Sequence, residues 1–396
     1  MRGFKDNIPP ISYGIDYVRR VFEKVSCKYG LDFIDMPVVE EASLYFRTSG
    51  DASDVCNKEL FEARKYKGEF EDWVLRPEGT ASCMRAIMEA NFMQQQKFAK
   101  FAYFAPMFRY NRPQKGRYRQ FLHAGWELIG MSGAAVDCEL ILGASEFLSN
   151  FNLKCVLEIN SIGSSSDRAI YRDILSKKMN LDQGIDPLKV LDKAQKIDAD
   201  IPSLAINDDD AREFEKLQNM LSKQALSQYG IEIVHNPYLV RGLDYYNSTV
   251  FEFKVNGQAV LAGGRYDGLM QQIGGGSVPA TGFGAGVDRI VESMEYQHIN
   301  QNIAIIPVDA NEYALYVAKQ LREKKNIFDI NNNSLLKLDD YTGCVIFWQL
   351  SLKKALQEAD KQGYRYVVIA GANEAEQNTF VLKDLVKRVE YQCRLG

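Results

Sequence analysis

A basic stretch between two apolar stretches constrains the fold of this chain more than any other feature. Residues 109–119 hold five basic side chains and no acidic one, in a protein of 396 residues with a formal net charge of -4. Pro113 and Gly116 interrupt the basic stretch, and strand-like sequence flanks it on both sides. The pattern predicts a strand, a tight basic turn and a returning strand within residues 101–130. Such a hairpin gathers guanidinium groups in a geometry suited to phosphate, and the alternative is a solvated hairpin without a ligand.

The returning strand has two chemically different faces, because successive strand residues point to opposite sides. One face is apolar and predicts a contact with the core: Leu122, Ala124, Trp126 and Leu128. The other carries an aromatic ring, an imidazole, a gap and a carboxylate: Phe121, His123, Gly125 and Glu127. The second face is typical of a pocket floor, although a half-exposed polar face fits this strand alone equally well.

The composition is that of an ordinary globular protein, with 46% hydrophobic and 25% charged residues. This length predicts two or three domains. Because the net charge is slightly negative, any site for a polyanion must be a local basic patch. The seven cysteines include no CxxC pair and there are three histidines, so we expect reduced thiols and no protein-bound metal.

The ends and apolar runs of the sequence indicate no membrane association. The first six residues contain no apolar signal core, and no apolar run approaches the ~18 residues needed for a membrane span. We therefore expect a cytoplasmic protein.

Residues 1–255 alternate between strand and helix signals. Apolar residues from Ile15 to Tyr29 recur every three or four positions and stop at Gly30, which predicts an amphipathic helix with a glycine cap. Leu31–Val39 is expected to be a short strand interrupted by Pro37, at an edge or an interface. Asn160–Gly163 is interpreted as a turn.

Residues 164–230 are polar and have helical periodicity. One helix in this part is expected to begin at the acidic residues Asp208–Asp210, which are favourable at a helix N-terminus. Strand-like sequence resumes at Ile231 and continues through Val250–Val255. From about residue 301, strands and helices alternate, which predicts a separate α/β domain with its own sheet.

Four further segments contain groups that suit a polar ligand. In the first, Glu78 stands before Gly79 and Thr80 and is able to bind an ammonium group, or else to cap the helix that follows. In the second, Arg241 precedes the paired tyrosines of Arg241–Tyr246. The tyrosine hydroxyls are able to hydrogen-bond a small polar ring and the arginine to neutralise phosphate charge, or else the segment is a strand with interfacial tyrosines.

The other two segments are rich in glycine. Ala262–Gly268 lacks both common nucleotide-binding glycine motifs and is interpreted as a tight turn that brings the backbone against a ligand. In Thr281–Arg289 small residues lead into an apolar helix, with Arg289 placed to meet a triphosphate. Helix packing through glycine is the alternative for the last segment.

Taken in order, these segments resemble those of histidyl-tRNA synthetase, a class II aminoacyl-tRNA synthetase, over essentially the whole chain. The helix before Gly30 and the strand with Pro37 resemble family motif 1, which builds the dimer interface. Phe108–Glu127 resembles motif 2 and Gly282–Arg289 resembles motif 3. Arg241–Tyr246 and Ala262–Gly268 resemble the two histidine-specific signatures.

The resemblance implies an α+β fold. A mostly antiparallel catalytic domain would be formed by residues 1–160 and 231–298, with a helical insertion at 161–230 and an α/β anticodon-binding domain at 299–396. It implies a homodimer and the ATP-dependent ligation of L-histidine to tRNA through a histidyl-adenylate. Magnesium would accompany ATP, held mostly by the phosphates.

The resemblance also implies roles for individual residues in binding histidine. Glu78, Gly79 and Thr80 would hold the α-amino group. Glu127 and Tyr246 would hydrogen-bond the imidazole. Four further residues would lie close to the amino acid: His123, Arg241, Tyr245 and Tyr266.

A second set of residues is implied to bind ATP and tRNA. Arg109 would bind the α-phosphate and Arg241 would stabilise the charge that develops there. The other residues on the ATP side would be Arg117, Phe121, which stacks on adenine, and Arg289. The residues facing the tRNA acceptor end would be Arg112, Gln114 and Lys115.

The chain departs from the family pattern in three places. His123 replaces the usual glutamine and is unable to copy both contacts of an amide. Asn111 replaces the usual glutamate in the basic loop, and the insertion is short. Two other functions share this fold, namely a regulatory subunit of ATP phosphoribosyltransferase and a tRNA-binding stress sensor. The intact basic loop and Arg109, Arg241 and Arg289 favour the enzyme over both.

Overall fold

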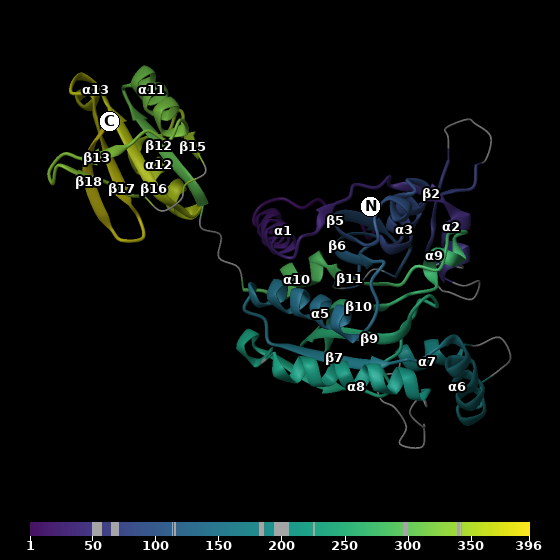
Figure 1. The fold of residues 1–396 in the computed structure, drawn as a ribbon. Helices are drawn as coiled ribbons and strands as arrows, with labels where there is room; N and C mark the ends of the chain where they lie inside the picture. The colour runs from purple at the N-terminus through teal and green to yellow at the C-terminus, as the bar shows by residue number, and fades with distance from the viewer. Residues whose placement is uncertain are drawn as a thin grey trace. The chain divides into compact units, whose positions relative to one another are not determined.

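The computed structural model of the 396-residue chain describes residues 1–49, 58–64, 71–112, 114, 116–181, 186–193, 206–224, 226–295, 300–338, 341 and 343–396. The chain divides into two compact units, Met1–Tyr296 and Gln297–Gly396 (Figure 1). Each unit has its own sheet and its own buried core, so each is described by itself.

The first unit is built on an eight-stranded sheet with the order β1-β5-β6-β11-β10-β9-β7-β8. Its inner pairs are antiparallel, and only the two edge pairs, β1 with β5 and β7 with β8, are parallel. The strands are β1 (Asp32–Phe33), β5 (Ala99–Phe108), β6 (Gln120–Ile129), β7 (Cys155–Ser161), β8 (Ile231–His235), β9 (Asn247–Val255), β10 (Gln258–Arg265) and β11 (Ala280–Gly286). Strands distant in sequence therefore lie side by side at the centre of the sheet.

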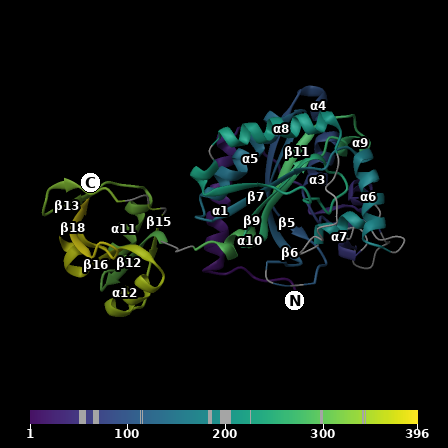
Figure 2. The same ribbon diagram turned by 90° about the horizontal axis from the view of Figure 1, so that it is seen from below.

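One face of this sheet is covered by helices. They are α1 (Ile11–Lys28), α5 (Ala134–Ser149), α8 (Asp208–Lys223) and α10 (Val287–Ser293), with the 3-10 turn η2 (Leu226–Tyr229). Their buried residues share one apolar core with Trp126 of β6 and Phe251 of β9. Helices α5 and α8 lie next to each other in both views (Figures 1 and 2). This face carries the main apolar core, and the polar groups described below lie on the other face.

The opposite face has a second core, which carries the groups described below. Around it lie a small antiparallel sheet and short helices. The sheet has the order β2-β4-β3, with β2 (Val39–Glu41), β4 (Trp73–Leu75) and β3 (Phe61–Ala63). The helices are α2 (Ala42–Ser49), α3 (Thr80–Glu89), α4 (Phe92–Gln95), α6 (Ser165–Lys178), α7 (Pro187–Lys193) and α9 (Leu269–Gln272).

The predicted elements of this unit are mostly present. Helix α1 ends at Lys28, and Gly30 follows with a φ of 70°, the left-handed conformation expected of a C-terminal glycine. Helix α8 starts at Asp208 and is capped by the Asn207 side chain, which accepts hydrogen bonds from the amides of Asp209 and Asp210.

Two local predictions are wrong. The single strand expected at 31–39 is split into β1 and β2, which belong to different sheets, with Pro37 between them. Asn160 does not begin a turn, because β7 continues through Ser161 and pairs Asn160 with Val250. The turn begins only after this pairing ends.

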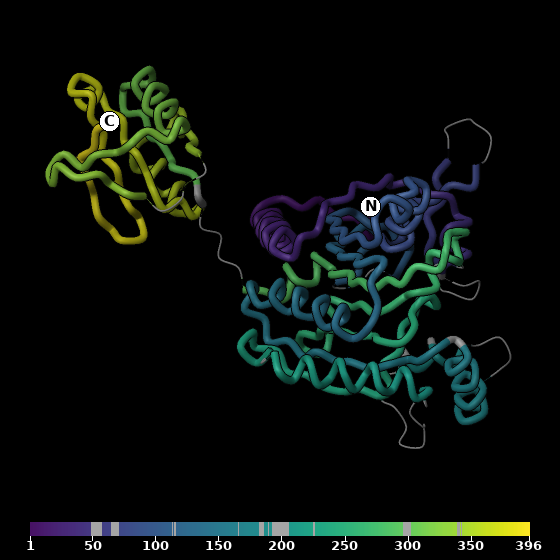
Figure 3. Tube along the Cα trace, in the orientation of Figure 1, coloured from purple at the N-terminus to yellow at the C-terminus, as the bar shows by residue number. Residues whose placement is uncertain are grey.

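The second unit is one continuous stretch of chain (Figure 3). Its sheet has the order β14-β13-β18-β17-β16-β12-β15; β12 pairs in parallel with β15 and β16, and the other pairs are antiparallel. The strands are β12 (Asn300–Val308), β13 (Ile327–Asp329), β14 (Ser334–Leu335), β15 (Gly343–Ile346), β16 (Tyr364–Gly371), β17 (Thr379–Asp384) and β18 (Val389–Leu395). The helices are α11 (Asn311–Arg322), α12 (Leu352–Lys361) and α13 (Ala372–Glu376). The predicted α/β pattern is confirmed, with additional antiparallel strands at one edge.

Among the described helices, none combines the length and the apolarity required to cross a membrane.

Candidate active site

The two faces of β6 differ as its sequence predicts. Ala124, Trp126 and Leu128 are buried in the core beneath the helices. Strand β6 pairs with β5 on one side and with β11 on the other, so it is an inner strand of the sheet. The side chains of its second face are therefore flanked by strands on both sides. His123 and Glu127 project from that face, which is the floor of the site.

Glu127 is completely buried and surrounded by hydroxyl groups. Its Oε1 accepts hydrogen bonds from Thr80 Oγ1 at 2.8 Å and Tyr103 OH at 3.2 Å, and its Oε2 accepts one from Tyr266 OH. Burial raises the pKa of Glu127 to about 8, against the opposing effect of these hydrogen bonds. A carboxyl group held this way is suited to receive a polar ring that carries an N–H donor.

Glu78 lies beside this pocket and caps helix α3. Its two oxygens accept hydrogen bonds from the amides of Thr80 at 2.7 Å and Ala81 at 2.9 Å, which confirms the helix-cap interpretation. Burial raises the pKa of Glu78, although these amides and the charge of Arg109 act in the opposite direction. Ammonium binding stays a prediction, and it remains compatible with the cap because each carboxylate oxygen has a second lone pair.

Tyr103 is a site residue that sequence reasoning missed. Its ring fills the space above two glycines: a Cβ on Gly79 would lie 2.4 Å from the ring, and one on Gly125 would lie 2.3 Å from it. Tyr103 stands directly opposite Gly125 in the β5–β6 register. An aromatic residue opposite a glycine in a hairpin would have indicated this contact. The sequence alone does not give the strand register that places the two residues opposite each other.

Three tyrosine rings close the pocket from another side. Tyr245 lies 4.7 Å from Tyr246 and 5.7 Å from Tyr266 between ring centroids, and all three are buried. Residues 241–246 form a loop before β9, so the alternative of a strand with interfacial tyrosines is wrong.

The interpretation of Ala262–Gly268 as a tight turn is also wrong over most of its length. Strand β10 continues through Arg265, and Gly263 and Gly264 lie inside the sheet. A Cβ on Gly263 would lie 2.3 Å from the carbonyl oxygen of Gly282 and 2.7 Å from the Phe251 ring. These glycines therefore allow strands and an aromatic ring to pack closely, and the turn comes only after Arg265.

Arginines gather at the other end of the β6 floor. Arg109 Nε donates to the carbonyl oxygen of Pro77 at 2.8 Å, and its guanidinium lies 5.7 Å from the centroid of Phe121. Arg289 donates to the carbonyl oxygens of Ala259 at 2.7 Å and Gly116 at 3.0 Å. Backbone carbonyls orient these side chains without neutralising them.

The charges of these arginines act on one another. The pKa of Arg289 is lowered by burial and then by Arg117 and Arg109, with a smaller contribution from Arg241. Arg241 forms an ion pair with Glu252, and its guanidinium lies 5.6 Å from the Tyr246 ring, at the junction with the tyrosine pocket. Several cationic side chains that repel one another are typical of a site that binds a polyanion, because the bound anion relieves the repulsion.

His123 stands between the arginines and Glu127 on the strand floor. Its ring rests on Gly284, where a Cβ would lie 2.1 Å from the imidazole. Its Nδ1 is buried and has no hydrogen-bond partner among the residues that the structure describes. Burial, followed by the charges of Arg109 and Arg289, lowers its pKa to about 3, so the imidazole is neutral near pH 7.

The basic turn is exposed and short. Gln114 and Arg117 exchange backbone hydrogen bonds of 3.2 and 2.9 Å, and Gly116 between them has a φ of 69°. Arg112, Gln114 and Arg117 are exposed. Lys115, the third residue expected at the tRNA acceptor end, lies outside the described residues.

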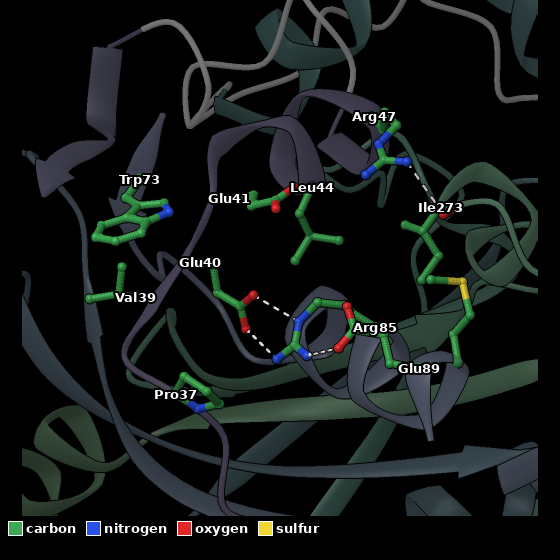
Figure 4. Close-up of a pocket in the computed structure, with 11 residues that line it drawn as sticks. Pro37, Val39, Glu40, Glu41, Leu44, Arg47, Trp73, Arg85, Glu89 and Ile273 are labelled. Carbon is green, nitrogen blue, oxygen red and sulfur yellow. Dashed lines mark hydrogen bonds and ion pairs between the residues drawn. The ribbon is translucent and has the colours of Figure 1, made fainter. Parts of the chain in front are cut away.

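A cavity of about 500 Å³ lies away from this floor, between β2, β4, α2 and α3 (Figure 4). Arg85 lines it and donates to both oxygens of the buried Glu40, each at 2.8 Å. Val39 and Trp73, each 40% exposed, line the cavity as well. None of the predicted site residues lines it.

The described residues contain no cluster of three potential metal ligands. Of the cysteines, Cys27 is exposed, five others are buried as free thiols, and Cys56 lies outside the described residues.

A mostly antiparallel sheet with a buried carboxyl group and an arginine cluster on one face, together with a separate α/β unit, is the architecture of a class II aminoacyl-tRNA synthetase. The family model described as histidyl-tRNA synthetase matches residues 3–163 and 154–290. The chain belongs to the histidyl-tRNA synthetase family.

Individual relatives agree with this assignment over almost the full chain. A histidine–tRNA ligase of Buchnera aphidicola is 36% identical, over 99% of this chain and 94% of its own. One from Hydrogenovibrio crunogenus is 35% identical with the same coverage. Among solved structures, the apo histidyl-tRNA synthetase of S. aureus superposes with a TM-score of 0.72 at 25% identity, covering 99% of this chain and 96% of that one.

Proposed function

We propose that this chain is an active histidine–tRNA ligase, which joins L-histidine to its tRNA at the expense of ATP through a histidyl-adenylate. Its family and its full-length ligase relatives support this activity. The observation that carries the proposal is the placement of Glu127 and Glu78 beside Arg109, Arg241 and Arg289 around one face of the sheet.

The order of side chains along β6 would match the order of the parts of an aminoacyl-adenylate. Residues two apart on a strand lie ~6.6 Å apart on the same face. Phe121, His123 and Glu127 therefore lie along one line, with the Arg109 guanidinium above Phe121. Adenine would stack on Phe121, the histidine imidazole would reach Glu127, and the carboxyl–phosphate junction would lie near His123.

The histidine end would be held by the buried polar groups. Glu127 would accept the imidazole N–H, with Tyr246 as the second partner and Tyr245 and Tyr266 enclosing the ring. Glu78 and Thr80, with Gly79 giving close backbone approach, would hold the α-ammonium group. His123 would offer one donor or acceptor nitrogen where a glutamine would offer two groups.

The ATP end would be held by arginines. Arg109 would contact the α-phosphate, and Arg117 and Arg289 the other phosphates. Arg241 would stabilise the negative charge that develops as the histidine carboxylate attacks the α-phosphorus and pyrophosphate leaves. The tRNA 3′ hydroxyl then attacks the adenylate carbonyl and releases AMP, and the chain acts mainly by positioning the reactants.

Magnesium would enter with ATP. The carboxylate nearest to Arg241 is Glu252, which is already paired with Arg241 and Lys254. This donor set suits an ion held mainly by phosphate oxygens.

The tRNA would contact two regions. Arg112, Gln114 and Lys115 would face the acceptor end, with Asn111 altering the loop contacts relative to the family. Residues 299–396 would bind the anticodon, and residues 161–230 would form the insertion between the two parts of the catalytic domain, 1–160 and 231–298. We place this activity in the cytoplasm.

A homodimer is proposed as well. Val39 and Trp73 are apolar, 40% exposed, and lie at the cavity of Figure 4, next to the segment that resembles motif 1. Exposed apolar groups of this kind favour burial by a second copy of the chain. Trp73→Arg should lower the mass measured by light scattering toward that of a monomer.

One assay separates the enzyme from a regulatory subunit or a tRNA-binding sensor. Histidine-dependent exchange of labelled pyrophosphate into ATP, followed by charging of tRNA, is expected from the enzyme alone. Tight tRNA binding without exchange would instead identify a sensor.

A further inference from the structure

We propose that Gly3 and Lys5 are positioning residues for the ATP site, because they brace the base of the basic hairpin next to its returning strand. The inference rests on the proposed ATP-binding role of that hairpin. It concerns a segment to which no role has been given so far, Arg2–Lys5.

Gly3 extends the hydrogen bonding of the hairpin by one strand-like contact. The amide of Arg119 donates to the carbonyl oxygen of Gly3 at 2.7 Å, while the carbonyl oxygen of Arg119 accepts from the amide of Arg109 at 2.9 Å. Gly3 is therefore two backbone hydrogen bonds away from Arg109, the arginine assigned to the α-phosphate. A shift of Gly3 would move the base of the hairpin.

The contact at Gly3 requires glycine. Its φ is 85°, and a Cβ there would lie 2.7 Å from Cγ and 2.8 Å from Cδ of Arg119. A larger residue is both strained in this conformation and forced against the Arg119 side chain. Substitution must therefore displace either the segment or the hairpin.

Lys5 connects the hairpin to the helix that carries Arg289. Its Nζ lies 3.0 Å from Tyr118 OH, 4.1 Å from the centroid of the Tyr118 ring and 3.6 Å from Glu292. The Tyr118 hydroxyl donates to Glu292. Glu292 stands three residues after Arg289 on α10, so the two lie on neighbouring positions of one helix face.

The other side of the hairpin base is fixed by aromatic packing. The Arg119 guanidinium lies 3.7 Å from the centroid of Tyr110, and Tyr110 packs against Phe61 at 5.4 Å. Phe61 in turn contacts Phe4 at 5.8 Å. The segment therefore contacts both sides of the hairpin base: Tyr118 and Arg119 directly, and Tyr110 through Phe61.

The turn beyond this base needs such support. Gln114 and Arg117 are exposed, and the turn reaches the body of the protein through the bond from Arg289 to Gly116. The position of Arg117, which is proposed to contact the phosphates, therefore depends on the direction in which the base points. Because Lys5 and Glu292 are partly exposed, their ion pair should add little to folding stability, and its effect should appear mainly in substrate binding.

The test uses the full-length enzyme and the variants Lys5→Met and Gly3→Val, with Lys28→Met as control. Lys28 also forms an ion pair with a distant residue, Glu146 at 2.5 Å, but on the helix-covered side. We expect the KM for ATP in pyrophosphate exchange to rise about 3-fold in Lys5→Met and about 10-fold or more in Gly3→Val, as the phosphate contacts are misplaced. The KM for histidine should stay near the wild-type value in both variants, the melting temperature should stay near it in Lys5→Met, and Lys28→Met should change nothing.

A double variant sharpens the result. Tyr118→Phe removes the hydroxyl that Lys5 and Glu292 share, so Lys5→Met and Tyr118→Phe together should cost less than the product of their separate effects. An unchanged KM for ATP in both Gly3→Val and Lys5→Met would overturn the inference, as would a loss of melting temperature without a change in KM. Absence of exchange in the wild-type protein would instead contradict the proposed function, so the two failures are distinguishable.

Discussion

The two ends of the β6 floor are built in opposite ways. Around Glu127 three hydroxyl groups already donate to one buried carboxyl group, and its Oε2 keeps one lone pair for a ligand. At the arginine end, Arg109 and Arg289 are held by carbonyl oxygens, and their positive charges remain. One end is a polar pocket whose groups already hydrogen-bond to one another, and the other is a cluster of positive charges.

The difference indicates that selection of the amino acid and stabilisation of the reacting phosphate depend on separate parts of the site. A pocket whose polar groups are buried rejects ligands that leave those groups unpaired. A cluster of like charges discriminates little, but it stabilises any polyanion, and most strongly the charge that grows during reaction. Specificity for the amino acid should therefore lie at Glu127, and the rate of adenylation at the arginines.

The largest effect is expected from Glu127→Ala. It removes the acceptor for the imidazole and leaves the hydroxyls of Thr80, Tyr103 and Tyr266 without their common partner. Histidine-dependent pyrophosphate exchange should fall by ~10⁴ or more. Near-normal exchange in this variant would show that Glu127 does not bind the histidine imidazole, and specificity would then not lie at this end of the floor.

Arg241→Ala should have a smaller but still severe effect. Arg241 stands at the junction of the two ends, paired with Glu252 and next to Tyr246. Loss of its charge should lower the rate of adenylation by ~10²–10³, with little change in the KM for histidine. The rate of adenylate formation in a single turnover measures this effect, and a thermal melt checks the fold. A change confined to histidine binding would show that Arg241 acts in the histidine pocket and not at the phosphate.

The sequence predicts the floor better than the walls of the site. The alternation of β6 sorts Trp126 from Glu127, because a strand has a period of two whatever its neighbours are. Tyr103 was missed, since its place above Gly125 depends on how two strands align. Gly263 was misplaced in a turn for a related reason: its lack of a side chain serves the approach of Phe251, a contact that only the folded sheet reveals.

His123 tests the middle of the floor, where the two ends meet. The buried Nδ1 of its neutral imidazole has no partner among the described residues, and we expect it to form one hydrogen bond to the reacting carboxyl group when substrate binds. His123→Gln should retain exchange within about 10-fold of the wild type, whereas His123→Leu should lose about 10-fold more, because a hydrogen bond to a charged group is missing. Equal activity of the two variants would show that His123 serves only to pack against Gly284.

The smallest effect concerns stability and follows from the burial of Glu127. The pKa of Glu127 is about 8 in the folded protein and ordinarily ~4.3 in an unfolded chain. The folded state therefore binds the extra proton between these values, and the free energy of unfolding falls as pH rises through this window, by at most ~1.4 kcal/mol per pH unit. Glu127→Gln keeps the shape without the charge, so its melting temperature should exceed that of the wild type at pH 8 and converge with it near pH 5. If the two proteins differed in melting temperature by the same amount at both pH values, Glu127 would be charged in the free enzyme at both. The pocket end, like the arginine end, would then carry a charge before substrate binds.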